Sequence, residues 1–453
     1  MAQIFKAKKK PLKQQTLELT ITGMDHQGRG IAKHNNKVCF VSGALPNETV
    51  KATLVEDKAK YSSAKVIKVI QASESRVDAF CEHYNQCGGC QLQHLEVSQQ
   101  VVEKQTAVTQ LFSKFAKLNS LNWQTPLLSK PVHYRRSARI AVMFDKAAKK
   151  MRVGYRASGS KNIVSINKCA VLDEVFTDVF TLFDDLINQH KALHSISHLQ
   201  LCQSDKQNFV VIRHTKAIND DTKALVEHIT KSQQFEIVWQ SESDAIEHSH
   251  LAMPFYYLKE FDLKFEFGLG NFIQVNAQVN EAMLKQAANW LDLKGDENLL
   301  DLFCGIGNFS LVLAKQAKQA KQAKQAKQAK SVIGVEGVTS AVAMAAQNAQ
   351  TNSITNAQFH CFDLTQSIQS APWFSKNLDV LVLDPSRTGA MAVLEQLPLK
   401  QFKTILYVSC DPVTLARDSA IISQAGFDLN KIGLMNMFPH TGHIETMALF
   451  QRR

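Results

Sequence analysis

The chain has 453 residues, which is enough for two to four domains of about 100 to 200 residues each. Its formal net charge of +11 favours a polyanionic partner, because lysine and arginine bind phosphates with release of counterions. No stretch approaches the ~18 apolar residues of a membrane span, and no apolar signal core follows the first lysines, so we expect a cytoplasmic protein without a membrane partner. Nine cysteines indicate metal binding or catalysis rather than a disulfide framework.

The N-terminal part combines a basic tail with a β-rich segment. Residues 1–15 carry five lysines and little to bury, so we expect a flexible basic arm. Residues 16–73 contain short β-like runs separated by glycine and proline, the pattern of a small closed barrel. The predicted strands are 17–21, 30–33, 37–42, 48–55 and 62–70. They predict an OB-like barrel, a common platform for oligonucleotides; the alternative is a barrel that only packs against its neighbour.

Three cysteines, Cys81, Cys87 and Cys90, lie within ten residues of one another. Their thiolates would repel unless a cation held them, and the two glycines before Cys90 let the backbone turn tightly around a centre. Cys169 is the next cysteine along the chain and is the predicted fourth ligand. Four thiolates suit tetrahedral zinc or an iron–sulfur cluster, and the spacing does not distinguish the two. The alternative is three unrelated buried cysteines.

Residues 74–270 are expected to form an α+β region that holds this centre. Within it, residues 133–140 place a tyrosine beside three arginines on a predicted strand. Planar guanidinium groups and a stacking ring suit phosphates and unstacked bases; the alternative is a solvated strand edge. In the next segment, residues 271–276, polar side chains flank a predicted apolar strand and need partners if they are buried.

Residues 271–453 alternate strands and helices, which predicts a doubly wound parallel sheet. The predicted strands are 298–303, 331–335, 357–362, 378–383, 404–408, 431–437 and 445–450. Gly305 and Gly307 follow the first strand, and Glu336 ends the second, where an acid can accept both ribose hydroxyls. Cys410 follows the fifth strand and precedes a predicted helix, which predicts a nucleophilic thiol with a lowered pKa; the alternative is a buried core cysteine.

From residue 314 to residue 330 the chain repeats Ala-Lys-Gln. All three residues favour helix, so the repeat is expected to extend the first helix of this sheet as a solvated spur. Gly305 and Glu336 are 31 residues apart, longer than the ~20 residues usual for nucleotide-binding units. Four surplus triplets, about 12 residues or about 18 Å of helix, account for the difference. The alternative is a phosphate-binding arm.

Five segments of the chain resemble, in order, the motifs of the S-adenosylmethionine-dependent RNA uridine-5-methyltransferases. They are residues 272–276 (FIQVN), 301–307 (DLFCGIG), 384–389 (DPSRTG), 409–412 (SCDP) and 443–446 (HIET). The N-terminal barrel, with residues 28–30 (GRG) and 44–48 (ALPNE), resembles a TRAM domain. A TRAM barrel, a cysteine-bound iron–sulfur insert and a methyltransferase domain together are similar to the members that modify one uridine of 23S ribosomal RNA.

The resemblance implies an α/β enzyme with S-adenosyl-L-methionine and a 4Fe-4S cluster as cofactors and 23S ribosomal RNA as substrate, and we expect a monomer. The implied S-adenosylmethionine site consists of Gln274, Phe303, Asn308, Glu336, Asp363 and Asp384. The implied cluster ligands are Cys81, Cys87, Cys90 and Cys169.

In the implied reaction the Cys410 thiolate adds to carbon 6 of a flipped uracil, and Glu445 later removes the proton from carbon 5. Glu445 has an alternative interpretation as a surface acid at a strand end. Two other functions remain open. Cytosine-5 methylation uses the same thiol addition, and a non-catalytic RNA-binding protein would need only the barrel and the cysteine centre.

Overall fold

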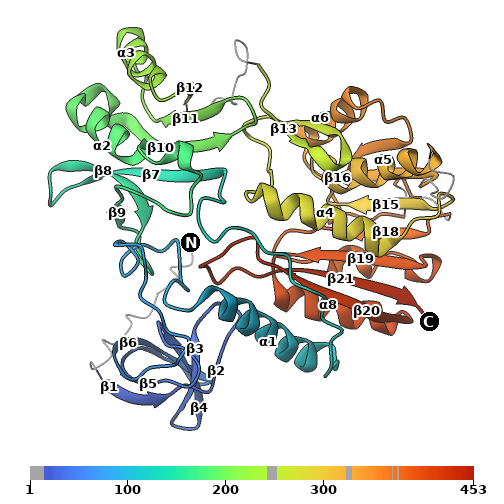
Figure 1. Cartoon of the computed structure of the whole chain (residues 1–453), viewed down its shortest axis with the longest axis horizontal. Coiled ribbons are helices and arrows are strands. Elements are labelled where there is room, and N and C mark those ends of the chain that lie inside the picture. The colour runs from blue at the N-terminus through green and yellow to red at the C-terminus, as the bar shows by residue number, and fades with distance from the viewer. Residues whose placement is uncertain (1–14, 242–251, 323–328, 370, 375–376) are drawn as a thin grey trace, which may run out of the picture. The chain divides into compact units, whose positions relative to one another are not determined.

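The computed structural model describes residues 15–241, 252–322, 329–369, 371–374 and 377–453 (Figure 1). The predicted basic arm therefore lies outside the described residues, except for Gln15. The chain forms two compact units, of residues 1–80, 90–107 and 440–443, and of residues 81–89, 108–439 and 444–453. Helix α1 (Val97–Phe115) contributes to both. No helix in the described parts of the chain is long and apolar enough to cross a membrane.

The first unit contains a six-stranded sheet around one apolar interior. Its strands are β1 (Thr16–Thr20), β2 (Gly23–Met24), β3 (Gly30–His34), β4 (Lys37–Ser42), β5 (Thr49–Asp57) and β6 (Tyr61–Gln71), in the order β1-β5-β6-β4-β3-β2. Alternate residues of β1 and β5 are buried, because successive side chains of a strand point to opposite faces. All five predicted strands are present, and the two-residue β2 was too short to give a sequence signal.

The second unit contains two large sheets. The first consists of β7 (Ser137–Asp145), β8 (Lys150–Arg156), β9 (Ile163–Ser165), β10 (Ile196–Gln203), β11 (Asn208–His214) and β12 (Phe235–Ser241), in the order β12-β11-β10-β7-β8-β9. Helices α2 (Val179–Gln189) and α3 (Asp220–Lys231) cover one face (Figure 1). Phe180, Phe183 and Leu186 of α2 pack there against the apolar side of the sheet.

The second sheet is formed by the C-terminal residues. Its strands are β15 (Asn298–Leu302), β16 (Ser331–Glu336), β17 (Ala357–Cys361), β18 (Val380–Leu383), β19 (Thr404–Ser409), β20 (Phe427–Met435) and β21 (Glu445–Arg452), in the order β17-β16-β15-β18-β19-β21-β20. The prediction of a parallel sheet is wrong for one strand: six strands run in the same direction, but β21 runs antiparallel to both of its neighbours, β19 and β20. After β19 the chain forms β20 at the edge of the sheet, and β21 then inserts between β19 and β20.

The helices of this sheet are α4 (Ala277–Leu291), α5 (Asn308–Gln322), α6 (Thr339–Thr351), α7 (Met391–Leu394) and α8 (Pro412–Gln424). The first part of the Ala-Lys-Gln repeat continues α5 through Gln322, as predicted, and residues 323–328 lie outside the described residues. Residues 271–276 do not form the predicted strand; they are an irregular segment that ends at Asn276, the N-cap of α4.

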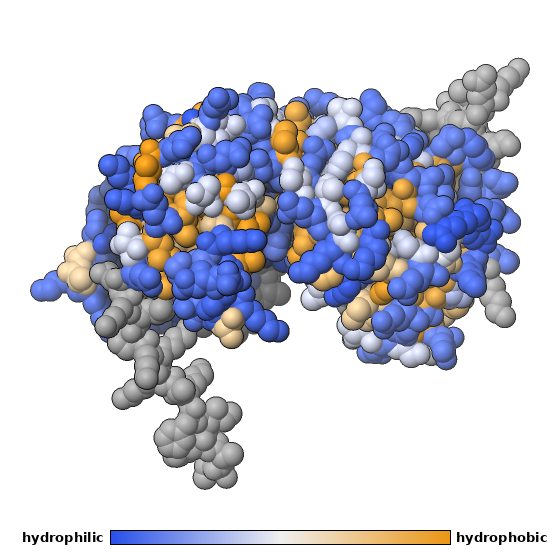
Figure 2. Space-filling model, turned by 90° about the horizontal axis from the view of Figure 1, so that it is seen from below, coloured by the Kyte–Doolittle hydropathy of each residue, from blue (hydrophilic) through white to orange (hydrophobic). Residues whose placement is uncertain are grey.

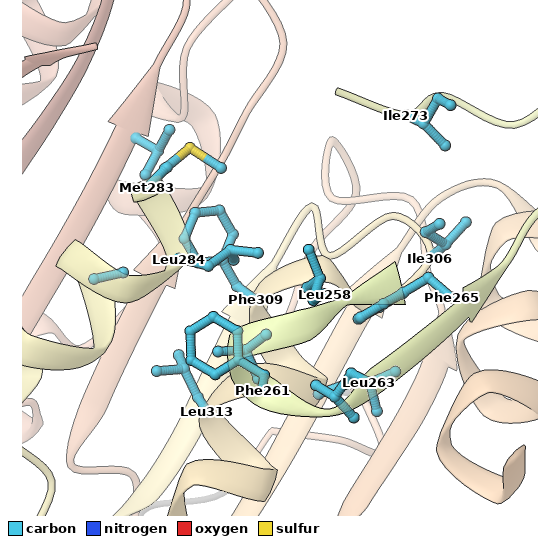
Figure 3. Close-up of a cluster of buried hydrophobic side chains, with 14 of the residues drawn as sticks. Leu258, Phe261, Leu263, Phe265, Ile273, Met283, Leu284, Ile306, Phe309 and Leu313 are labelled. Atoms are coloured by element: carbon cyan, nitrogen blue, oxygen red, sulfur yellow. The ribbon is translucent and has the colours of Figure 1, made fainter. Parts of the chain in front are cut away.

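A buried apolar cluster fixes the start of α5. Between α4 and α5 it contains side chains of the short hairpin β13 (Phe255–Leu258) and β14 (Leu263–Glu266) (Figure 3). Phe261 lies near Phe309 and Leu313 of α5, and Phe265 lies beside Ile306, just before that helix (Figure 3). Each such side chain contributes roughly 1.5–3 kcal/mol when fully buried. On the outside, hydrophilic residues predominate on the face shown in Figure 2, with hydrophobic residues scattered among them.

Candidate functional site

A tight turn at the end of β15 leaves room for a ligand. Phe303, Gly305 and Gly307 all have positive φ, at 65°, 56° and 88°. The turn is fixed by the amides of Phe303 and Cys304, which donate to the carbonyl of Val335 at 2.9 and 3.2 Å. A Cβ added at Gly305 would meet nothing within 4 Å, so open space adjoins its backbone. Helix α5 begins directly after this turn, and the N-terminus of a helix favours an anion.

Glu336, at the end of β16, holds this turn to the next loop. One carboxylate oxygen accepts a hydrogen bond from the Gly305 amide at 3.2 Å, and the other accepts one from the Val338 amide at 3.0 Å. Phe362 donates its amide to the Glu336 carbonyl at 2.9 Å, so Asp363 follows a residue that contacts Glu336. Asp363 is exposed and accepts hydrogen bonds from the hydroxyl and amide of Thr365, which lower its pKa.

Asn308, the first residue of α5, has a fixed side chain. Its Nδ2 donates to Oδ1 of Asn280 at 2.8 Å, and its Oδ1 accepts from the hydroxyl of Tyr256 at 3.2 Å. The Gln274 carbonyl, in the irregular segment before α4, accepts a hydrogen bond from Nε of Arg136 at 2.8 Å. The site residues implied by the resemblance did not include Asn280, Tyr256 or Arg136. The sequence signal available for these three residues was the presence of polar side chains within buried segments.

Two carboxyl groups lie on adjacent central strands. Asp384 follows β18 and donates its amide to the Leu302 carbonyl of β15 at 3.4 Å. Burial raises the pKa of the Asp384 carboxyl to about 7. Asp301, in β15, is fully buried and accepts from the Ser310 hydroxyl at 2.5 Å. Burial, together with the charges of Asp384 and Glu336, raises its pKa to about 7 despite that hydrogen bond.

Cys410 and Glu445 face each other across two antiparallel strands. The ladder between β19 and β21 ends with Ser409 opposite Thr446, so the next pair of positions is Cys410 and Glu445. Both residues are half-buried. The negative charges of Glu445 and Asp384 are both near enough to the Cys410 thiol to raise its pKa. The charge of Arg387 also acts on this thiol.

The predicted lowering of the Cys410 pKa is wrong. Burial, then the negative charges of Glu445 and Asp384, raise the pKa of Cys410 to about 12, and the positive charge of Arg387 offsets only part of this. Helix α8 does not compensate, because its N-cap Asp411 already accepts hydrogen bonds from the amides of Val413 and Thr414. The sequence alone did not show that two carboxylates meet beside the thiol.

Three of the four predicted cluster ligands, Cys81, Cys87 and Cys169, belong to the second unit, whereas Cys90 belongs to the first. Burial raises the pKa of the Cys169 thiol, and the charges of Cys87 and Cys81 raise it further. Among the described residues, no three His, Cys, Asp or Glu side chains come together closely enough to hold a metal ion. The predicted metal centre therefore stays a prediction.

Comparisons with known proteins identify the family. A family profile described as tRNA (Uracil-5-)-methyltransferase matches residues 96–453, and a TRAM domain profile matches residues 3–67. The 23S rRNA (uracil(1939)-C(5))-methyltransferase RlmD of Pseudoalteromonas translucida (strain TAC 125) is 78% identical over the whole of both chains. The protein of the same name from Shewanella halifaxensis (strain HAW-EB4) is 42% identical over 100% of this chain and 99% of its own.

A solved structure shares the fold. The Pyrococcus abyssi tRNA (uracil-54, C5)-methyltransferase, crystallised with S-adenosyl-L-homocysteine, aligns with 96% of this chain and 100% of its own, with a TM-score of 0.71 and 21% identity. The profile match and the full-length relatives together show that the chain belongs to the family of S-adenosylmethionine-dependent RNA uracil-5-methyltransferases and has an N-terminal TRAM domain.

Proposed function

We propose that this protein transfers a methyl group from S-adenosylmethionine to carbon 5 of one uridine in 23S ribosomal RNA. The substrate is inferred from the two relatives named above, which match over the full length of the chain. The observation that carries the chemistry is the position of Cys410 opposite Glu445, with Asp384 as their neighbour. A nucleophile and two carboxylates are the groups that addition to a pyrimidine and removal of its proton require.

The residues after β15 and β16 fit the cofactor. We assign the carboxylate of its amino acid part to Gln274 and Asn308, because Asn308 opens a helix whose N-terminus favours an anion. Phe303 supplies the turn, Glu336 the acceptor for the ribose hydroxyls and Asp363 the acceptor for the adenine amino group. Open space beside Gly305, next to the Glu336 carboxylate, supports this arrangement. We assign Asp384, whose charge acts on the Cys410 thiol, to the polar edge of the base.

In the proposed reaction, Cys410 releases its proton to water, its sulfur adds to carbon 6 of uracil, and the electron pair of the carbon 5–carbon 6 double bond moves into an enolate. Carbon 5 becomes electron-rich as a result and accepts the methyl group, which the sulfonium of S-adenosylmethionine supplies. Glu445 then takes the proton from carbon 5, the bond between carbon 6 and sulfur breaks, and the thiolate of Cys410 is restored. The target uridine must leave its stack to reach these groups, so we expect a loop or an opened helix of the RNA.

One assay separates uridine methylation from cytosine methylation and from RNA binding without catalysis. The purified protein is incubated with methyl-labelled S-adenosylmethionine and with RNAs that contain the target segment with uridine or cytidine at the target position. Label in 5-methyluridine alone supports the proposal. Label in 5-methylcytidine would favour the cytosine reaction, and RNA binding without any labelled nucleoside would favour a binding protein.

We further propose that Cys81, Cys87, Cys90 and Cys169 hold a structural 4Fe-4S cluster. The donor chemistry fits. Cys87 accepts a hydrogen bond from the Gly89 amide at 3.4 Å, and the amides of residues 171 and 172 hydrogen-bond to Cys169. Amide donors to sulfur are usual around such clusters, and Cys90 follows Cys87 by only three residues. These ligands lie outside the cofactor sheet, so we assign them to stability and RNA docking.

Anaerobically purified protein tests this assignment. It should be brown, and iron and sulfide should be present at about four atoms each per chain. Colourless protein with stoichiometric zinc would contradict the cluster. Cys87→Ser should lower stability or RNA affinity while leaving S-adenosylmethionine affinity unchanged, and Cys39→Ser, in the core of β4, is a control for loss of a thiol outside the proposed site.

We also propose the domain boundaries, the cellular location and the oligomeric state. We assign residues 16–73 to the TRAM barrel, 74–270 to the central region and 271–453 to the methyltransferase domain. The TRAM barrel and the net charge of +11 support RNA binding. Ribosomal RNA as the substrate implies work in the cytoplasm, and we propose that the protein acts as a monomer.

A further inference from the structure

Arg136 is a buried cation that the proposed reaction does not use. It lies directly before β7, and only 5% of its surface is exposed. Burying a guanidinium is costly unless its charge and its donors are satisfied. Burial accordingly lowers the pKa of Arg136, although the group stays charged.

The first contact of this guanidinium is with the segment before α4. Its Nε donates to the Gln274 carbonyl at 2.8 Å. The backbone amide of Arg136 donates to the neighbouring Val275 carbonyl at 2.9 Å. These two hydrogen bonds from Arg136 hold a segment that is in neither a strand nor a helix. They fix the backbone of Gln274 and therefore the starting point of its side chain.

The second contact leads to Asn308. The guanidinium carbon lies 4.4 Å from the centre of the Tyr256 ring, a cation–π distance, and Tyr256 is itself 96% buried. The hydroxyl of Tyr256 donates to Oδ1 of Asn308 at 3.2 Å, and Asn280 accepts from Nδ2 of Asn308 at 2.8 Å. Oδ1 is thereby committed to protein donors, which orients Nδ2 and leaves one of its two hydrogens for a ligand.

One donor of Arg136 stays unused. Its Nη2 is buried and has no hydrogen-bond partner among the described residues. Within the same described ranges Arg136 forms no ion pair; Asp205 acts on it only at longer range, and its carboxylate accepts from the Tyr257 amide instead. A buried positive charge with a spare donor therefore contacts the backbone of Gln274 and, through Tyr256, the side chain of Asn308.

We infer that Arg136 and Tyr256 form a positioning pair for the carboxylate of the cofactor's amino acid part. Arg136 supplies buried positive charge and fixes the Gln274 backbone, and Tyr256 fixes the Asn308 amide. This inference rests on the proposed function, because it needs Gln274 and Asn308 to bind the cofactor. It adds that affinity for this end of the cofactor is set by residues from the central region, outside the motifs of the methyltransferase domain.

Two ligands that differ only at this end provide the test. S-adenosylhomocysteine has the amino acid part, whereas 5′-deoxy-5′-methylthioadenosine keeps the adenosine and the sulfur but lacks it. Calorimetric titration of full-length protein without RNA should show that Arg136→Met weakens the affinity for S-adenosylhomocysteine at least tenfold, since the buried positive charge and the hydrogen bond to the Gln274 carbonyl are both lost. Affinity for methylthioadenosine should change less than twofold. Tyr256→Phe keeps the ring under the guanidinium. It should weaken the affinity for S-adenosylhomocysteine about fivefold, because the hydrogen bond to Asn308 is lost.

The matched controls are Arg152→Met and Tyr257→Phe. Arg152, on the neighbouring strand β8, pairs with Asp145 at the end of β7, and the exposed Tyr257 forms a hydrogen bond with Asp262, so neither variant should change either affinity. Equal weakening of both ligands, or no weakening of either, overturns the inference; if Arg136→Met does not fold, Tyr256→Phe decides by the same comparison. Failure of the unmodified protein to bind S-adenosylhomocysteine would contradict the proposed function itself.

Discussion

At the residue scale, the Cys410 thiol is almost fully protonated at neutral pH. Its pKa is raised to about 12 by burial and by the negative charges of Glu445 and Asp384, so the thiolate is rare in the protein without ligands. Substrate binding, proton transfer and the positive charge of Arg387 must together produce the thiolate. The alternative of an inert core cysteine is not supported by burial alone, because Cys410 is half-buried beside two carboxylates.

This environment predicts how adduct formation depends on pH. Well below a pKa of about 12, each unit of pH raises the thiolate fraction about tenfold. The rate of covalent complex formation with RNA that carries 5-fluorouridine, whose fluorine cannot leave as a proton, should therefore rise about tenfold per unit from pH 7 to pH 9. Rates from quenched gel assays that level off below pH 8 would show that the thiol titrates lower.

The Asp384 carboxyl should lower the free energy of unfolding of the folded protein as the pH rises. A carboxyl whose folded pKa is raised to about 7 keeps its proton where the unfolded chain has lost it, so this group costs stability as pH rises from about 4 to about 7. We expect Asp384→Asn to increase the free energy of unfolding by about 1–2 kcal/mol at pH 8 and by nothing at pH 4, as judged by urea titration without ligands.

Asp379→Asn is the control of opposite sign. Burial alone would raise the Asp379 pKa, but the Asn298 amide and the Lys403 ammonium at 2.9 Å lower it overall. The neutral variant should therefore lose stability at pH 8. If both variants change stability in the same direction, the charge assignment for Asp384 is wrong.

At the element scale, hydrophobic patterning predicted every strand of the barrel except the two-residue β2, and every strand of the C-terminal sheet. It did not predict the antiparallel insertion of β21, because the direction of a strand depends on where the chain returns and not on its own residues. That insertion is what brings Glu445 opposite Cys410. The irregular conformation of residues 271–276 was missed for a similar reason: its hydrogen bonds come from Arg136, 138 positions away.

The Ala-Lys-Gln repeat is expected to be dispensable. The first part of helix α5 is packed in the interior through Phe309, Leu311, Leu313 and Ala314, which are all buried. At the other end of the repeat, Ala329 is buried again. Removing residues 317–328 deletes four triplets and shifts the helical register by about 120°, which is harmless only beyond the packed turns. Methyl transfer should stay within twofold. A loss above tenfold, with unchanged circular dichroism, would mean that the repeat contacts RNA or orders the cofactor turn.

At the scale of the whole molecule, the proposed site combines residues separated by more than a hundred positions in the sequence. The sequence pattern indicated Cys410 and the turn at Gly305, the resemblance to a family added Glu445, and the structure adds their neighbours. Asn280 and Tyr256 lie outside every predicted motif, and the surroundings of Asp301 and Arg136 were not predicted, since they depend on burial and on partners from other elements. The metal centre remains the part that rests most on cysteine spacing.

The central claim is that Cys410 adds to the base and Glu445 later releases it, and the most direct measurement is the covalent complex formed by Glu445→Gln. The glutamine keeps the shape of the side chain but cannot take the carbon 5 proton. With S-adenosylmethionine labelled in its methyl group, this variant should accumulate a labelled RNA–protein complex that survives denaturing electrophoresis. Cys410→Ala and the double variant should form none. Turnover of Glu445→Gln at the unmodified rate, or inactivity without an adduct despite bound RNA and cofactor, would contradict the account.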